Sequence, residues 1–167
     1  MNTKRLTTDA LLTSLVLIIF IVEAQIPPLV PIPGVKLGLA NIITVYALFR
    51  LGPKDAIAIL LGRIVLGSVF AGQMISFFYS LAGGLLCFAV MMVLRKKLAE
   101  NQFWVASVFG AVFHNVGQIL VAMVLFKTAA VAAYLPVLVV SGIVTGLFTG
   151  LAAQFVIDRM RKIRPKE

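Results

Sequence analysis

Residues 26–41, IPPLVPIPGVKLGLAN, interrupt an otherwise apolar chain and decide how it divides into helices. Prolines remove backbone donors and fix φ, so the helix before this stretch cannot continue through it. After Gly34 an apolar helical run opens, with Asn41 expected one turn inside it. The free N–H groups of such a helix start, together with Lys36, suit an anionic or hydrogen-bond-accepting group. The same residues also fit a plain re-entry loop, in which Lys36 reaches the membrane interface.

The composition is that of a membrane protein. The chain has 167 residues, of which 61% are hydrophobic and 13% are charged, and its mean hydropathy is +1.07. A soluble domain is nearer half apolar and about a quarter charged. The net charge of +9 lies mainly in short loops and in the tail, as membrane insertion produces, so we expect a lipid bilayer around the chain and no nucleic-acid partner. The single cysteine, Cys87, is expected to pack as a small apolar residue.

Hydrophobic runs predict an all-α integral membrane protein, a bundle of six transmembrane helices in one domain over residues 1–167. The predicted helices cover about residues 8–24, 36–49, 55–71, 74–94, 103–126 and 134–157. The second run is short for a membrane span, so part of the preceding loop is expected to dip into the bilayer. We find no internal repeat and no linker that would indicate a second domain.

Basic residues predict the orientation. With six spans, twelve of the 15 Lys and Arg residues lie on the side of the two termini, whereas only Lys36 and Lys127 lie on the other side. Arg63 falls inside the third span. Because cytoplasmic loops are enriched in Lys and Arg, both termini are predicted to be cytoplasmic and the 26–34 loop to face outward.

Two intramembrane charges are the first candidates for chemistry. A cation near the bilayer centre costs about 2.5–3.5 kcal/mol even on the lenient insertion scale, so Arg63 should face the bundle interior with a partner. Glu23 is the only acidic residue away from the cytoplasmic side. An ion pair of Glu23 with Arg63 or with Lys36 could simply pin helices together, or the same charges could serve a binding site.

Polar residues in the fifth run form a second candidate group. His114 and Gln118 are four residues apart and share one helix face, while Asn115 points about 100° away. These three residues could make ordinary interhelical hydrogen bonds, or they could form part of a binding site. One histidine without a neighbouring cysteine or carboxylate predicts no metal site. Three glycines in the sixth run, spaced four apart, predict a close-packing face: Gly142, Gly146 and Gly150.

These residues predict a pocket in the outer half of the bundle, roofed by residues 27–34. Net positive charge favours a small-molecule ligand with a carboxylate, phosphate or carbonyl group, and the apolar surroundings favour an apolar body. Gln73 and Gln118 are expected at the rim of the pocket. The candidate binding residues are Glu23, Gly34, Lys36, Asn41, Arg63, Gln73, His114 and Gln118. Common nucleotide-binding, hydrolase, zinc-protease and Mg²⁺-diphosphate motifs do not occur, so we expect no catalytic residues and no cofactor.

A family resemblance rests on Glu23-x-x-Ile26-Pro27, on the string PGVKLGLAN at residues 33–41 and on Arg63 in the third run. These residues resemble the Gx transporter family, often labelled heptaprenyl diphosphate synthase component I. That family is similar to the substrate-binding S components of energy-coupling factor (ECF) transporters. The resemblance implies a protein of the prokaryotic cell membrane that captures a vitamin-like or isoprenoid- or quinone-related molecule at the outer face.

The resemblance also implies partners, namely a transmembrane coupling subunit with two ATPases. S components often dock on that subunit through an AxxxA-like pair in the first helix, which Ala10 and Ser14 match except for the serine. A second function stays open, that of a non-catalytic membrane subunit assisting a prenyl diphosphate synthase or a membrane redox enzyme. The synthase label does not fit catalysis by this chain, because no Mg²⁺-diphosphate motif is present.

Overall fold

The computed structural model describes residues 3–27, 38–72, 74–99 and 102–163. Within these ranges the regular structure is entirely helical, as predicted, with six α-helices and one 3₁₀-helix. In chain order the elements are α1 (Thr3–Glu23), α2 (Asn41–Arg50), α3 (Pro53–Ala71), α4 (Met74–Arg95), α5 (Phe103–Phe126), η1 (Ala129–Tyr134) and α6 (Leu135–Ile163).

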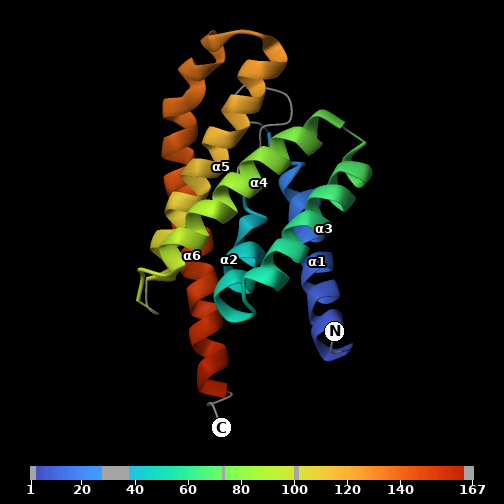
Figure 1. Ribbon diagram of the computed structural model, residues 1–167, viewed down its shortest axis with the longest axis vertical. Coiled ribbons are helices and arrows are strands. Elements are labelled where there is room, and N and C mark those ends of the chain that lie inside the picture. Colours follow the sequence, from blue (N-terminus) through green and yellow to red (C-terminus); the bar gives the residue numbers. More distant parts are fainter. Residues whose placement is uncertain (1–2, 28–37, 73, 100–101, 164–167) are drawn as a thin grey trace.

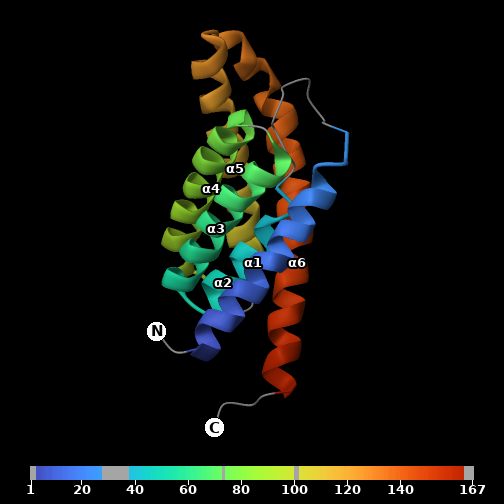
Figure 2. The same cartoon turned by 90° about the vertical axis from the view of Figure 1, so that its right-hand side faces the viewer.

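The helices run up and down along the long axis of the molecule, and the first turn of α1 lies at the same end as the last turn of α6 (Figures 1 and 2). The most extensive interfaces join α4 to α5 and α5 to α6. Helix α2 is the central element, because it contacts each of the other five α-helices. The bundle is therefore built around its shortest α-helix.

Four helices are long and apolar enough to cross a membrane, judged by length and composition within the described residues. They are α1, α4, α5 and the continuous segment of η1 and α6. Helix α2 has 10 residues and is about 15 Å long, half the thickness of a bilayer core. Helix α3 carries Lys54, Asp55 and Arg63 within 19 residues. The predicted membrane-bound bundle is supported, and four of the six predicted spans meet these criteria.

Helix α2 begins later than predicted. The sequence favoured a helical run from residue 36 with Asn41 one turn inside it, but Asn41 is the first helical residue and residues 38–40 form a turn. The reason is Gly38, whose φ of +84° lies in the left-handed region that glycine adopts without steric cost and that a helix cannot contain. The loop that was predicted to dip into the bilayer lies mostly outside the described residues, and within the turn that follows it Gly38 and Ala40 are buried in the bundle.

The other helix boundaries follow local signals. Pro53 opens α3 at a position where its missing N–H is not needed, and the left-handed Gly72 ends the same helix. Helix α1 starts five residues before the predicted position, and α6 runs six residues past it. The 29 residues of α6 span about 43 Å, longer than a bilayer core, so its basic last turns extend beyond the bundle (Figure 2).

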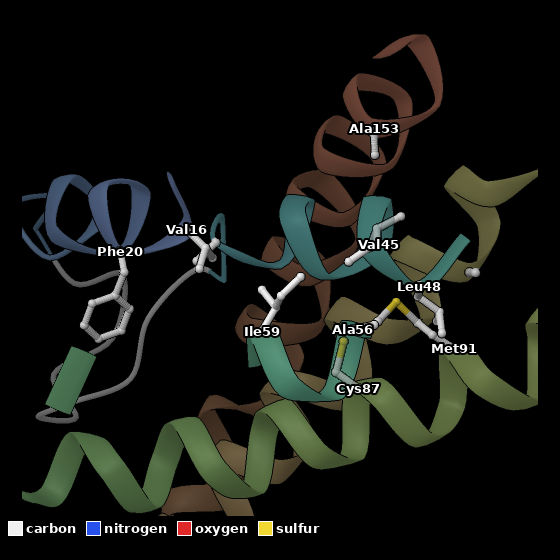
Figure 3. Close-up of a cluster of buried hydrophobic side chains, with 12 residues drawn as sticks. Val16, Phe20, Val45, Leu48, Ala56, Ile59, Cys87, Met91 and Ala153 are labelled. Carbon is white, nitrogen blue, oxygen red and sulfur yellow. The ribbon is translucent and has the colours of Figure 1, made fainter. Parts of the chain in front are cut away.

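An apolar core surrounds α2 (Figure 3). Val45 and Leu48 of α2 are fully buried and belong to one apolar cluster with Val16 of α1 and with Met91 and Cys87 of α4; Cys87 is 1% exposed. Cys87 therefore packs as a small apolar residue, as predicted. The same cluster includes Phe20 of α1, which also lines the polar cavity described below.

The predicted glycine face of α6 lies directly against α5. A Cβ atom added to Gly146 would be 2.7 Å from the Cα atom of Val108, and one added to Gly150 would be 2.7 Å from the Cα atom of Trp104. Helices α4 and α5 approach equally closely, since a Cβ on Gly117 would be 2.8 Å from the carbonyl oxygen of Ala82. Glycine therefore makes α4, α5 and α6 one tightly packed unit.

Candidate functional site

The carboxylate of Glu23 joins the end of α1 to the start of α2. Its Oε1 accepts a hydrogen bond from the backbone N–H of Gly38, and its Oε2 accepts one from the N–H of Ala40 at 3.3 Å. Glu23 is only 4% exposed. Both N–H groups belong to the turn that precedes α2, so the carboxylate satisfies amides just ahead of this helix and also lies near the positive end of its dipole.

Arg63 lies in the middle of α3 and points into the bundle, as predicted, with 3% exposure. Its Nε has no hydrogen-bond partner among the described residues. Glu23 and Arg63 are both described, and no ion pair directly joins them; the ion pair that the described residues do contain links Arg5 to Asp55. Of the two ion pairs considered for Glu23, the one with Arg63 is therefore not a direct contact, and the one with Lys36 lies outside the described residues; the carboxylate of Glu23 binds backbone amides.

A small cavity brings the two charges together. It is lined by residues from α1, the turn before α2, α3, α4 and α5: Phe20, Glu23, Gly38, Arg63, Ser80, His114 and Gln118. Its volume of about 10 Å³ is enough for about one water molecule. The lining groups offer a cation, a carboxylate and neutral donors and acceptors, which is a set suited to hydrogen bonding a polar ligand group.

Helix α5 supplies the polar wall opposite Gly38. His114 Nε2 and Gln118 Nε2 are 3.2 Å apart, which confirms that these residues share a face, and both side chains are buried. Gly38 lies against this wall, since a Cβ atom there would be 3.5 Å from Cδ2 of His114. Asn115 points away and donates a hydrogen bond to the carbonyl oxygen of Leu138 in α6. Asn115 therefore belongs to the packing of α5 on α6.

Further buried polar atoms lack partners within the described ranges, and one of the residues that carry them, Asn41, lies beside a cavity residue. Asn41, at the first position of α2, is 3% exposed, and neither atom of its side-chain amide has a partner in the described part of the chain. Its Nδ2 is near Gly38, at 3.1 Å from the position of a Cβ there. The buried hydroxyl groups of Thr44 and Ser76 likewise lack partners among the described residues. Burying polar atoms of this kind costs free energy unless another group forms hydrogen bonds with them.

The structure thus places four of the eight predicted binding residues around one cavity, Glu23, Arg63, His114 and Gln118, with Asn41 beside it. Gln118 was expected at a rim, but it is only 1% exposed because α4 packs against its helix. Gly34, Lys36 and Gln73 lie outside the described residues.

Three lining residues were not predicted, Phe20, Gly38 and Ser80. A signal existed for Ser80, because Ser76 and Ser80 are four residues apart and share one face of α4. Among the described residues, no group of three His, Cys, Asp or Glu side chains is placed to hold a metal ion.

The proposed docking pair lies on the outer surface of α1. Ala10 and Ser14 are both exposed, and the Ser14 hydroxyl donates to the carbonyl oxygen of Ala10 at 3.0 Å. Because that hydroxyl is bonded within its own helix, the pair presents a small, largely apolar notch. The apolar side chains of Leu11 and Ile18 are exposed on the same helix. A surface of this kind can face either lipid or another membrane helix.

A family model described as heptaprenyl diphosphate synthase component I matches residues 12–156, which include all the lining residues of the cavity. This is the family predicted from the string at residues 33–41 and from Arg63. Curated proteins and solved structures gave no match.

Proposed function

The chain belongs to the family described as heptaprenyl diphosphate synthase component I, and from this premise we propose that it is a membrane subunit that binds a small molecule. The proposed role is that of an S component of an ECF transporter, capturing its ligand at the outer face of the cell membrane. The observation that carries this proposal is the polar cavity of Glu23, Arg63, His114 and Gln118 inside an apolar helical bundle.

The energetic argument concerns Arg63. A cation in the middle of a membrane helix costs about 2.5–3.5 kcal/mol on the lenient scale, and such residues usually mark a ligand or ion path. Arg63 is only 3% exposed and lines the cavity. The carboxylate of Glu23 lines the same cavity but already accepts hydrogen bonds from backbone amides. A ligand with a carboxylate, phosphate or carbonyl group would supply the partner that Arg63 Nε lacks among the described residues.

The size of the cavity indicates how a ligand would enter. Helices α4 and α5, which α6 packs against as one tightly packed unit, form one wall, and α1, α3 and the turn at Gly38 form the other. A ligand larger than a water molecule requires these walls to separate. The glycine contacts hold the first wall together, so α1 and the turn at Gly38 are the parts expected to move.

The orientation is also part of the proposal. Six spans and the distribution of Lys and Arg support cytoplasmic termini, which puts the cavity in the outer half of the membrane. A membrane-impermeant maleimide applied to intact cells should label a cysteine placed at Lys127 and should not label one placed at Ala99. The reverse pattern would put the cavity on the cytoplasmic side and contradict capture from outside.

A second function is favoured by the family name itself, which describes a synthase component. In that role the chain would be a non-catalytic membrane subunit that assists a prenyl diphosphate synthase. Affinity purification from native membranes separates the two roles. Recovery of a transmembrane coupling subunit with two ATPases supports transport, whereas recovery of a soluble prenyl synthase without ATPases supports the second role.

The direct test of ligand binding is native mass spectrometry of the protein purified from native membranes. We expect a small molecule to remain bound to the wild type and to be lost from Arg63→Leu, while Arg50→Leu, which removes an exposed arginine, keeps it. The double variant Glu23→Gln with Arg63→Leu distinguishes a ligand-binding role of these charges from a structural one, because it removes both charges together and leaves neither buried without the other. A folded double variant that retains the molecule would show that the charges are only structural.

A further inference from the structure

The backbone amides of Gly38 and Ala40, in the turn just before α2, already bind an anion. Both oxygens of Glu23 accept hydrogen bonds from these amides, one from Gly38 and one from Ala40. Glu23 is the last residue of α1, where the helix dipole disfavours a negative charge, and it reaches across to the start of α2, where the dipole favours one. The carboxylate is therefore held by the turn before α2 rather than by its own helix.

A second and independent feature points to an external ligand. The guanidinium of Arg63 is 3% exposed, lines the same cavity as Glu23 and Gly38, and has an Nε without a partner among the described residues. Arginine is the side chain best suited to bind a carboxylate or a phosphate through two parallel hydrogen bonds. The cavity thus has two anion-binding elements, the amides of the turn at Gly38 and Ala40 and the side chain of Arg63, and the protein's own carboxylate hydrogen-bonds only to the first.

We propose that Glu23 is an internal competitor for the ligand. The oxyanion group of the ligand, a carboxylate or a phosphate, binds the amides of Gly38 and Ala40 together with Arg63 and displaces Glu23 from them. This inference rests on the proposed function, since it specifies how the same cavity binds its ligand. It makes Arg63 a ligand-binding residue and Glu23 a positioning residue that closes the site.

The surroundings of Glu23 permit this exchange. Ala24, Gln25 and Ile26, which follow it directly, are exposed. A short movement at the end of α1 therefore brings the displaced carboxylate to water, where its charge is solvated. The exchange also breaks the hydrogen bonds between α1 and the start of α2, so ligand binding frees α1 to move away from the other wall of the cavity.

The test uses acetate as the probe, because acetate replaces the atoms that Glu23→Ala removes beyond Cβ. Acetate affinity is measured from the saturation of the thermal unfolding midpoint in detergent at constant ionic strength, with acetamide as the neutral comparison. Phosphate is titrated in parallel to distinguish the two oxyanions. Asp158→Ala is the matched control, since it removes an exposed acidic side chain near the end of α6.

We expect Glu23→Ala to bind acetate or phosphate ten- to a hundredfold more tightly than the wild type, the range that one charge-assisted hydrogen bond provides. Asp158→Ala should match the wild type, acetamide should not bind, and adding Arg63→Leu to Glu23→Ala should abolish the gain. If Glu23→Ala does not fold, Glu23→Gln is titrated instead and the same gain is expected, because a neutral amide competes less well.

Equal or weaker oxyanion binding by the folded Glu23 variant would overturn the inference, and so would a gain that survives Arg63→Leu. If the proposed function itself is wrong, a different result is expected. In that case no molecule is retained by the wild type in native mass spectrometry, whether or not the Glu23 variant binds acetate.

Discussion

Replacing Gly146 with alanine tests whether the close approach of α5 and α6 holds the bundle together. The new Cβ would be 2.7 Å from the Cα of Val108, 2.9 Å from the Cβ of Ala111 and 3.0 Å from the carbonyl oxygen of Ser107. Ordinary contacts begin at 3.4 Å, so α6 would have to move by roughly 0.7 Å. Three such close contacts should lower the free energy of unfolding by about 3 kcal/mol, the upper end of the range expected when an extra methyl group is forced into a well-packed core. Alanine also favours the helix over glycine by about 1 kcal/mol. The expected net decrease in the free energy of unfolding is therefore about 2 kcal/mol.

The matched control is Gly62→Ala, also within a helix. Its added Cβ would lie 3.3 Å from the Cγ2 of Thr13, a methyl group that can shift slightly. We expect this variant to be as stable as the wild type or up to about 1 kcal/mol more stable. Both variants are compared by reversible unfolding from detergent micelles into SDS, followed by circular dichroism. Equal stability of Gly146→Ala and Gly62→Ala would refute the reasoning, because helix propensity alone predicts equal effects.

Three further predictions concern contacts away from the cavity. Asn115→Leu should lower the free energy of unfolding by about 1 kcal/mol, since it removes the donor to the Leu138 carbonyl; an unchanged value in the same SDS assay would contradict the packing role. The Arg5–Asp55 pair, at 2.9 Å with Arg5 56% exposed, should give a coupling of only about 0.2–1 kcal/mol in a double-mutant cycle, and this coupling should weaken with salt. Cys87, at 1% exposure, should react with maleimide only after unfolding, and labelling of the folded protein would show that the α2 core is open.

Much of the bundle was predictable from local patterns. Apolar runs and their breaks predicted α3, α4 and α5 nearly to the residue, because proline, glycine and basic turns stop helices by local sterics. The four-residue spacing of glycines predicted the face that α6 turns toward α5. The burial of Arg63 followed from the cost of exposing a cation to lipid.

The partners of Glu23 could not be predicted in this way. The carboxylate bonds to backbone amides 15 and 17 residues away, and a backbone amide has no signature in the sequence. The start of α2 was missed for a related reason. Several glycines in the chain could adopt a left-handed conformation, and only the tertiary structure selects Gly38 for it. Cavity walls from several helices likewise depend on packing that periodicity does not specify.

The half-length α2 has a consequence for how the chain enters the membrane. A segment of 10 residues is too short to be recognised as a span on its own, and α3 carries three charged residues, including Arg63. Neither helix should therefore partition into lipid independently during synthesis. We expect α2 and α3 to wait at the membrane insertion machinery until α4, which carries no charged residue before Arg95, emerges and inserts. The centre of this protein would then be assembled in a protein-lined environment, and its polar cavity would never face lipid during biogenesis.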